Sequence, residues 1–162
     1  MTAGAPVIRR ATPADAATVH RLVVLLEDHV HVREAIPATA ADIARALSAS
    51  PPALLAELLE RDGRTLAMAT WYPVFSTSLG CGGIFVLDLY VEAGERGRGH
   101  GVRLLAHMAG LARARGDGFL KLEVDAHNDD AAAVYARLGF ERSSSHPLLL
   151  TGEPLARLAA RT

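Results

Sequence analysis

The sequence has 162 residues, a length that fits one folded domain, and 50% of them are hydrophobic, which excludes an intrinsically disordered chain. With 17 basic and 18 acidic side chains the net charge is −1, so no electrostatic attraction to nucleic acid is expected. Charged residues interrupt every apolar run before it reaches the roughly 20 residues of a membrane-spanning helix. A single cysteine, Cys81, and a start without a basic and apolar leader predict a cytoplasmic protein.

The first predicted elements are a strand at residues 7–10 and a helix that begins after Thr12 and runs to about His31. Thr12 is followed by proline and, three residues later, by an acid, a pattern typical of a helix start. Apolar residues then recur at helical spacing. A second capping pattern begins another helix after Thr39, and the prolines at 51–52 end it.

Three strands are expected next. Residues 54–60 fit a helix or a strand by pattern, and the hairpin signal at 62–63 favours the strand. Residues 65–75 and 84–91 are rich in β-branched, aromatic and other apolar side chains, and we expect the glycine-rich residues 80–83 between them to form a loop. The three runs predict an antiparallel meander.

The second half of the chain returns to alternating helix and strand. A helical pattern covers residues 99–115, a strand pattern 119–125, and a helix capped by Asn128 extends to Leu138. A strand-like stretch at 147–151 precedes a tail. The order predicts an α/β fold with a mixed, mostly antiparallel central sheet flanked by helices, in a single domain over residues 1–162 with its core at about 7–158.

A glycine-rich turn, residues 96–101 with the sequence RGRGHG, follows a strand and begins a helix. Backbone N–H groups at a helix start have no intrahelical partner and attract anions, so this turn suits a pyrophosphate. Its glycines let an anion approach the backbone, and its arginines add positive charge. A solvated basic turn is the alternative. The spacing matches neither the phosphate-binding loop of the nucleoside triphosphatases nor the dinucleotide-binding turn.

The order of these motifs resembles the GNAT family of N-acetyltransferases. The family pattern R/Q-x-x-G-x-G/A corresponds to Arg96, Gly99 and Gly101, and its other marks correspond to the strand 87–91, Asn128 and the stretch 135–140, which reads YARLGF. The resemblance extends from Val7 to about Leu158. It implies acetyl-coenzyme A as the cofactor and transfer of its acetyl group to an amine.

The resemblance also implies a set of cofactor-binding residues on the strand before the turn, on the turn and on the following helix. They are Leu89, Tyr90, Val91, Arg96, Gly97, Arg98, Gly99, His100, Gly101, Val102, Asn128, Ala131 and Tyr135. In the family the backbone N–H groups of Leu89 and Val91 would polarise the acetyl carbonyl. Asn128 has a second role as a helix cap.

Transfer from a thioester to an amine needs a deprotonated nucleophile, a stabilised oxyanion and a proton for the departing thiolate. The resemblance assigns that proton to Tyr135, for which a core tyrosine is the alternative. The base is a carboxylate, and we consider five candidates. They are Glu123, Asp125, Asp88, Glu92 and Asp28. We expect Glu123 and Asp125 to share one face of a strand, because they lie two residues apart.

The substrate side is predicted from charge and from a closer resemblance. Glu27 and Asp28, near the end of the first helix, and Asp125 would select a cationic substrate. The stretch around Tyr72 looks like the diamine, polyamine and thialysine N-acetyltransferase branch of the family. Leu87 stands where members of that branch carry a glutamate.

The sequence thus predicts an acetyl-coenzyme A-dependent N-acetyltransferase that acts by direct attack of an amine on the bound donor. The acceptor would be a primary amine of a small molecule: a diamine, an amino acid or an amine-bearing antibiotic. The alternatives are a protein acetyltransferase of lysine or the N-terminus, and a non-catalytic sensor of acyl-coenzyme A. No metal, nucleic acid or membrane is expected as a partner, and a homodimer through the sheet edges or residues 154–158 is a family expectation.

Overall fold

The computed structural model describes residues 4–30, 36–144 and 148–160. It forms two compact units, which divide between His127 and Asn128. The first unit contains a five-stranded sheet in the order β1-β2-β3-β4-β5, in which β5 runs parallel to β4 and every other neighbouring pair is antiparallel. This arrangement confirms the predicted mixed α/β fold. The single domain over residues 1–162 stays a prediction.

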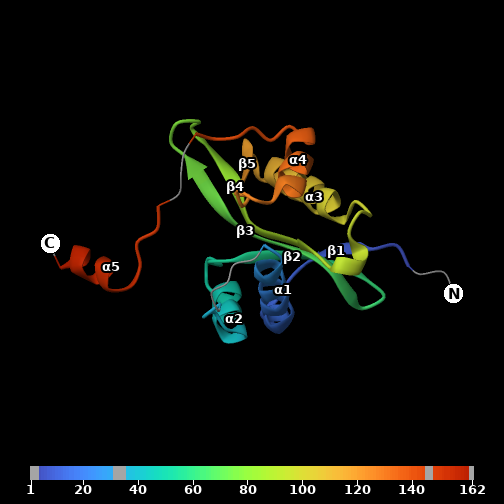
Figure 1. Ribbon diagram of the computed structural model, residues 1–162, viewed down its shortest axis with the longest axis horizontal. Helices are drawn as coiled ribbons and strands as arrows, with labels where there is room; N and C mark the ends of the chain where they lie inside the picture. Colours follow the sequence, from blue (N-terminus) through green and yellow to red (C-terminus); the bar gives the residue numbers. More distant parts are fainter. Residues whose placement is uncertain (1–3, 31–35, 145–147, 161–162) are drawn as a thin grey trace. The chain divides into compact units, whose positions relative to one another are not determined.

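The elements of the first unit follow the predicted order. They are β1 (Val7–Arg10), α1 (Ala16–His29), α2 (Ala40–Ser48), β2 (Leu55–Arg61), β3 (Arg64–Ser76), β4 (Cys81–Val91), α3 (His100–Arg115) and β5 (Phe119–Leu122), with short 3-10 turns η1 (Pro13–Asp15) and η2 (Ala93–Glu95). Helices α1 and α2 lie on one side of the sheet and α3 on the other (Figure 1). The first helix ends at His29, and His31, its predicted end, lies outside the described residues.

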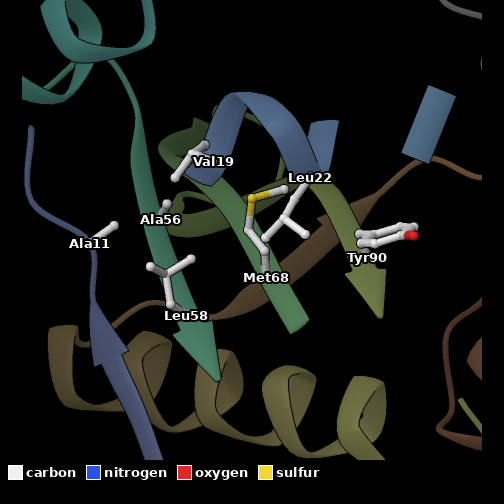
Figure 2. Packing of buried hydrophobic residues seen from close by; sticks show 7 residues of the cluster. All are labelled: Ala11, Val19, Leu22, Ala56, Leu58, Met68 and Tyr90. Atoms are coloured by element: carbon white, nitrogen blue, oxygen red, sulfur yellow. The ribbon is translucent and has the colours of Figure 1, made fainter. Parts of the chain in front are cut away.

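The core between α1 and the sheet follows from the two periodicities of the sequence. Val19 and Leu22, three apart on α1, pack on side chains that alternate along the strands (Figure 2). The sheet contributes Ala56, Leu58, Met68 and Tyr90 to this cluster. Residues between these positions, such as Glu57 and Trp71, therefore face α3. There Glu57 is 2% exposed and contacts Arg10, Trp71 and His107 through its two carboxylate oxygens.

Two strand boundaries differ from the prediction. Residues 81–83, predicted as loop, belong to β4, because the hairpin continues to the pair Ser76 and Cys81. Glycine is needed there, since a Cβ atom on Gly83 would lie 2.5 Å from the ring of Phe119 on β5. In contrast, β5 ends at Leu122 rather than Asp125, because it pairs only with residues 83–86 of β4.

The second unit holds α4 (Asp129–Arg137), as predicted, and α5 (Gly152–Ala159), where a tail was predicted. The missed helix has recognisable signals: proline in its first turn and an ion pair of 2.9 Å between Glu153 and Arg157, one helical turn apart. Residues 148–151 form no strand, and Pro147 lies outside the described residues. Within the described ranges, no helix has the length and apolar character needed to cross a membrane.

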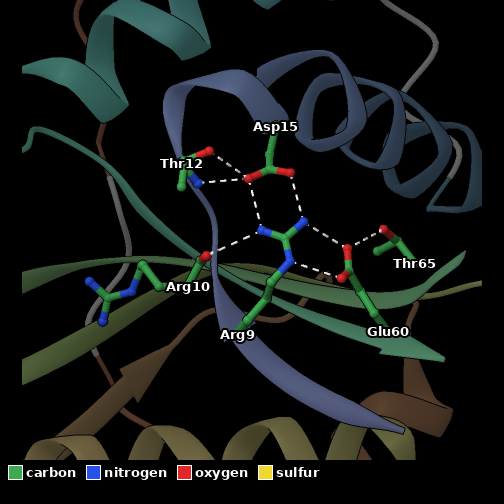
Figure 3. Close-up of polar contacts among 6 residues, drawn as sticks. All are labelled: Arg9, Arg10, Thr12, Asp15, Glu60 and Thr65. Carbon is green, nitrogen blue, oxygen red and sulfur yellow. Dashed lines mark hydrogen bonds and ion pairs between the residues drawn. The ribbon is translucent and has the colours of Figure 1, made fainter. Parts of the chain in front are cut away.

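One guanidinium connects β1, η1 and β2. Arg9 donates two hydrogen bonds to Asp15, at 2.7 and 2.9 Å, and two to Glu60, both at 2.8 Å (Figure 3). Asp15 also accepts the backbone N–H of Thr12 at 2.8 Å, which closes the turn that begins α1. The hydrogen bonds from Arg9 hold the pKa of the Asp15 carboxyl well below its usual range.

Replacing Arg9 by methionine is expected to lower the free energy of unfolding by about 1 kcal/mol at neutral pH, a modest loss because the arginine is partly solvent-exposed. A carboxylate with a depressed folded-state pKa stabilises the protein above its unfolded pKa and loses that effect as the pH falls through the folded one. The difference between the two proteins should therefore shrink in acid. Urea unfolding from pH 7 downward measures it; parallel pH profiles would contradict the assignment.

Candidate active site

The site begins at an irregularity in β4. Thr70 of β3 pairs with Asp88, whereas the next residue, Trp71, pairs with Val86. Leu87 is therefore an extra residue, a β-bulge, and its side chain is 51% exposed. The parallel partner strand β5 stops opposite Val86. Beyond the bulge, β4 continues without β5 beside it, and one edge of residues 87–91 is open.

The backbone of this edge carries N–H groups that point away from β3. The N–H of Asp88 is bound by the Thr70 hydroxyl at 3.1 Å, and that of Glu92 by the Leu66 carbonyl at 2.9 Å, so both point toward β3. Successive N–H groups of a strand point in opposite directions. The N–H groups of Leu89 and Val91 therefore point to the edge of β4 that has no β5 residue beside it. These two donors are about 7 Å apart along the strand, so they suit successive polar groups of an extended ligand, and a single one of them suits a carbonyl oxygen that gains negative charge.

The glycine-rich turn lies directly after this strand. Gly97 and Gly99 have φ angles of 74° and 78°, a conformation that favours glycine, and open space lies where their Cβ atoms would be. The first bond within α3 runs from the N–H of Arg103 to the carbonyl of Gly99 at 2.9 Å, so the N–H groups of residues 100–102 have no partner within the helix. Gly101 keeps this helix start close to β4: its Cβ position is 3.7 Å from Val91.

Several side chains predicted to touch the cofactor point elsewhere. Arg96 donates to the Val91 carbonyl at 3.1 Å and lies over the Tyr90 ring, which belongs to the core beneath α1. His100 is 8% exposed and contacts Glu95 at 3.3 Å. For Tyr90 and His100, only backbone groups are available to a cofactor. Val102 is 40% exposed, and the Arg98 side chain is largely exposed.

Carboxylates gather on the side of the sheet that α1 covers. Asp88 is half-buried and accepts a hydrogen bond from the Thr70 hydroxyl. Burial raises the pKa of the Asp88 carboxyl, and the Thr70 hydrogen bond offsets part of that rise. Burial also raises the pKa of Glu27 on α1, and the negative charges of Asp88 and Asp125 raise it further. Three carboxylates from three segments are thus electrostatically coupled, an arrangement that favours a cation.

The remaining predicted acids lie apart from this cluster or are engaged. Asp28 and Glu123 are exposed, and Glu92 accepts a hydrogen bond from Arg21 at 2.9 Å. The predicted shared strand face of Glu123 and Asp125 is wrong, because β5 ends before both residues. Tyr72 lies two residues from Thr70 on the same face of β3, and its ring stacks on Phe85 with a centroid distance of 5.1 Å.

The second unit holds the other predicted residues. The Asn128 side chain caps α4 by accepting the N–H of Ala131 at 3.2 Å. The Tyr135 ring lies 5.8 Å from the Phe140 ring, and the helix ends through Gly139 with a φ of 90°. Burial raises the pKa of Tyr135, so its hydroxyl stays protonated and is a proton donor at neutral pH.

Sequence reasoning missed two residues of the first unit. Thr70, which bonds both the backbone and the side chain of Asp88, looks like any β-branched strand residue. Glu95, buried beside the turn, looks like a surface acid before an arginine-rich loop. In neither case does the sequence carry a local signal, because each role depends on a partner from another segment. Among the described residues, no three His, Cys, Asp or Glu side chains form a group that could hold a metal ion.

Comparison with known proteins identifies the class. Residues 21–140 match the acetyltransferase (GNAT) family, which is most of the chain. The chain therefore belongs to the GNAT family and is an N-acetyltransferase. Over 138 residues, 85% of this chain and 91% of the relative, it is 28% identical to the uncharacterized N-acetyltransferase YhfO of Bacillus subtilis (strain 168). Over 53 residues it is 47% identical to the streptothricin acetyltransferase of Streptomyces lavendulae, a match covering 33% of this chain and 28% of that enzyme's length.

Solved structures share the fold. An integron cassette protein from V. cholerae superposes with a TM-score of 0.76 at 21% identity, over 96% of this chain and 98% of that one. An aminoglycoside acetyltransferase from a soil metagenome has a TM-score of 0.76 at 15% identity, over 91% and 97% of the two chains. An acetyltransferase of Clostridium acetobutylicum, solved with acetyl-coenzyme A, has a TM-score of 0.75 at 16% identity, over 90% and 96%.

The GNAT family uses acetyl-coenzyme A, and the predicted cofactor is thereby confirmed. The residues present fit it. Left-handed glycines leave open space beside the turn, and the N–H groups at the start of α3 have no partner within the helix, which suits a pyrophosphate. The strand that carries the N–H groups of Leu89 and Val91 leads into this turn.

Proposed function

We propose that the protein transfers an acetyl group from acetyl-coenzyme A to a primary amine of a small, cationic molecule by direct attack. The observation that carries the proposal is the position of the Asp88 carboxylate: it is half-buried, electrostatically coupled to Glu27, and lies next to the strand edge where Leu89 and Val91 present their N–H groups. A base, a cation-binding cluster and oxyanion donors thus meet at one bulge of β4.

The chain's own groups perform three tasks in this proposal. When bound, acetyl-coenzyme A supplies an acetyl thioester, and the transfer forms a C–N bond and breaks a C–S bond. Asp88 accepts the proton that the ammonium group must lose, directly or through a water molecule. One of the N–H groups of Leu89 and Val91, which lie about 7 Å apart along the strand, stabilises the carbonyl oxygen as it becomes negative, and the other is free for a polar group farther along the cofactor. Tyr135 donates its phenolic proton to the departing sulfur, so that coenzyme A leaves as a thiol, and the second proton that the nitrogen loses as the amide forms returns to the phenolate.

The proposed acceptor carries more than one amine. Glu27 and Asp125 would bind an ammonium group that does not react, while Asp88 deprotonates the one that does. Tyr72, on the same face, would pack against the carbon skeleton of the acceptor. The partial similarity to a streptothricin acetyltransferase and the fold shared with aminoglycoside acetyltransferases support an amine-bearing antibiotic over an amino acid or a diamine. A cytoplasmic location and a homodimer stay predictions.

The test is thiol release from acetyl-coenzyme A by the purified protein, with streptothricin, aminoglycosides, polyamines, thialysine, amino acids and a lysine peptide as acceptors. We expect release with a multiply charged antibiotic and a mass increase of the product by one acetyl group. Preference for the lysine peptide would instead indicate a protein acetyltransferase. Cofactor binding without turnover on any acceptor would favour a sensor and contradict the proposal.

A further inference from the structure

A buried glutamate lies beside the glycine-rich turn. Glu95, the last residue of η2, is 5% exposed and has two arginines and a histidine as neighbours, from three segments. Its Oε1 accepts a hydrogen bond from Arg61 of β2 at 2.8 Å. Its Oε2 lies 3.3 Å from Nε2 of His100, the first residue of α3, and 3.6 Å from Nη1 of Arg98 within the turn.

A negatively charged side chain such as Glu95 is not expected next to a turn that binds an anion. A carboxylate next to the turn reduces the positive potential that a pyrophosphate needs. Burial by itself would raise the pKa of Glu95, but His100, Arg61 and Arg98 together lower it below its ordinary value, so the group is ionised at neutral pH. By charge alone, Glu95 should weaken cofactor binding.

The contacts of Glu95 order the turn, which offsets the unfavourable effect of its charge. The turn contains two glycines in a left-handed conformation, and glycine loses more conformational freedom on ordering than any other residue. Glu95 contacts this flexible stretch at two points, through Arg98 between the glycines and through His100 after them. Arg61 connects this group to the sheet. A binding loop that is ordered beforehand costs less to order when its ligand arrives.

We propose that Glu95 is a positioning residue of the cofactor site, which holds the turn 96–101 in the conformation that presents its N–H groups to the pyrophosphate. The inference rests on the proposed use of this turn by acetyl-coenzyme A. Glu95 does not touch the cofactor itself. It acts through Arg98 and His100, whose positions it determines from the side of the sheet.

The variant Glu95→Gln separates positioning from charge, because the two effects have opposite signs. Glutamine has one acceptor oxygen and cannot serve Arg61 and the turn together, so positioning predicts weaker binding of coenzyme A, by about 10-fold. Loss of a repulsive charge alone predicts tighter binding. Calorimetric titration with coenzyme A measures the dissociation constant without turnover. Tighter or unchanged binding by the folded variant would overturn the proposal.

A truncated donor shows whether the effect is confined to the turn. S-acetylpantetheine lacks the pyrophosphate, so its kcat/KM should be the same for Glu95→Gln and the wild type, while the KM for acetyl-coenzyme A rises with little change in kcat. An equal loss with both donors would indicate general damage and overturn the positioning role. If the wild type itself does not favour acetyl-coenzyme A over S-acetylpantetheine, the turn does not bind the pyrophosphate, and the proposed use of the turn fails as well.

A matched control is Glu57→Gln. Glu57 is another buried glutamate that contacts an arginine and a histidine, and it lies on β2 beneath a different part of α3. The Glu57→Gln variant should leave the ratio between the two donors unchanged. A second variant, Arg61→Gln, removes only the connection to β2 and should weaken coenzyme A binding in the same direction as Glu95→Gln. If Glu95→Gln does not fold, the Arg61→Gln variant tests the proposal instead. Unchanged binding of coenzyme A by Arg61→Gln would then overturn the proposal.

Discussion

The Asp88→Asn variant is expected to lose about 10²- to 10⁴-fold in kcat/KM at neutral pH, the usual contribution of a general base. Asparagine keeps the size of the side chain and can still accept the hydrogen bond from Thr70, but it cannot take a proton from the substrate. Because burial raises the pKa of Asp88, the wild-type kcat/KM should fall in acid at a higher pH than an ordinary aspartate would give. The variant should lack that acidic limb.

The stability of the Asp88→Asn variant should rise although its activity falls. In the folded protein burial disfavours the charged form of Asp88, so ionisation opposes folding above the raised pKa, and the penalty disappears below the pKa of the unfolded chain. Asp88→Asn should therefore have a higher Tm than the wild type at neutral pH, and the difference should vanish in acid. A control, Asp62→Asn, changes a carboxylate in the β2–β3 turn, where φ is 50° and asparagine is tolerated. Full activity of Asp88→Asn would exclude it as the base and leave Glu27 and Asp125 of the same cluster.

The Tyr135→Phe variant is expected to lose about 10²-fold in kcat, while KM for acetyl-coenzyme A stays close to the wild-type value. The phenol holds its proton at neutral pH, and because burial raises its pKa it gives that proton up only as negative charge develops on the departing sulfur. Phenylalanine retains the ring beside Phe140 and removes only the donor. Steady-state kinetics with the best acceptor from the panel measure both constants.

A change of leaving group tests the assignment of Tyr135 independently. The p-nitrophenolate of p-nitrophenyl acetate departs without a proton, so Tyr135→Phe should acetylate the amine from this donor at the wild-type rate. An equal loss with both donors would mean that the hydroxyl positions the substrate instead of protonating the sulfur. Unchanged turnover with acetyl-coenzyme A would remove Tyr135 from the mechanism.

Elements with a local signal could be predicted from the sequence. The turn 96–101 and helix α3 are an example: glycines at the left-handed positions, an apolar stripe and Gly116 at the end mark them without reference to the rest of the chain. The capping pattern at Thr39 fixed the start of α2, where the Asp42 N–H binds the Thr39 hydroxyl at 3.3 Å. Such contacts span three or four residues, so the sequence order already contains them.

Strand boundaries required the tertiary structure. Residues 81–83 read as a loop because of their glycines, yet β4 includes them, since Phe119 occupies the space that side chains would fill. The strand predicted at 119–125 ends early because its pairing with β4 stops at Val86, the residue before the bulge at Leu87. Both results depend on which strand lies alongside, a fact that periodicity does not contain.

The sequence by itself determined the class of enzyme, its cofactor and the backbone that would bind a pyrophosphate, because these depend on short motifs in a fixed order. Only the tertiary structure showed which of the five carboxylates predicted as bases are exposed, paired or coupled to another carboxylate. Asp88 accepts a hydrogen bond from Thr70 and is coupled electrostatically to Glu27. Glu123 and Asp28 are exposed, and Glu92 accepts a hydrogen bond from Arg21. The physical reason is that the pKa of a carboxyl depends on burial and on charges from other segments, and neither can be read from neighbours in the sequence.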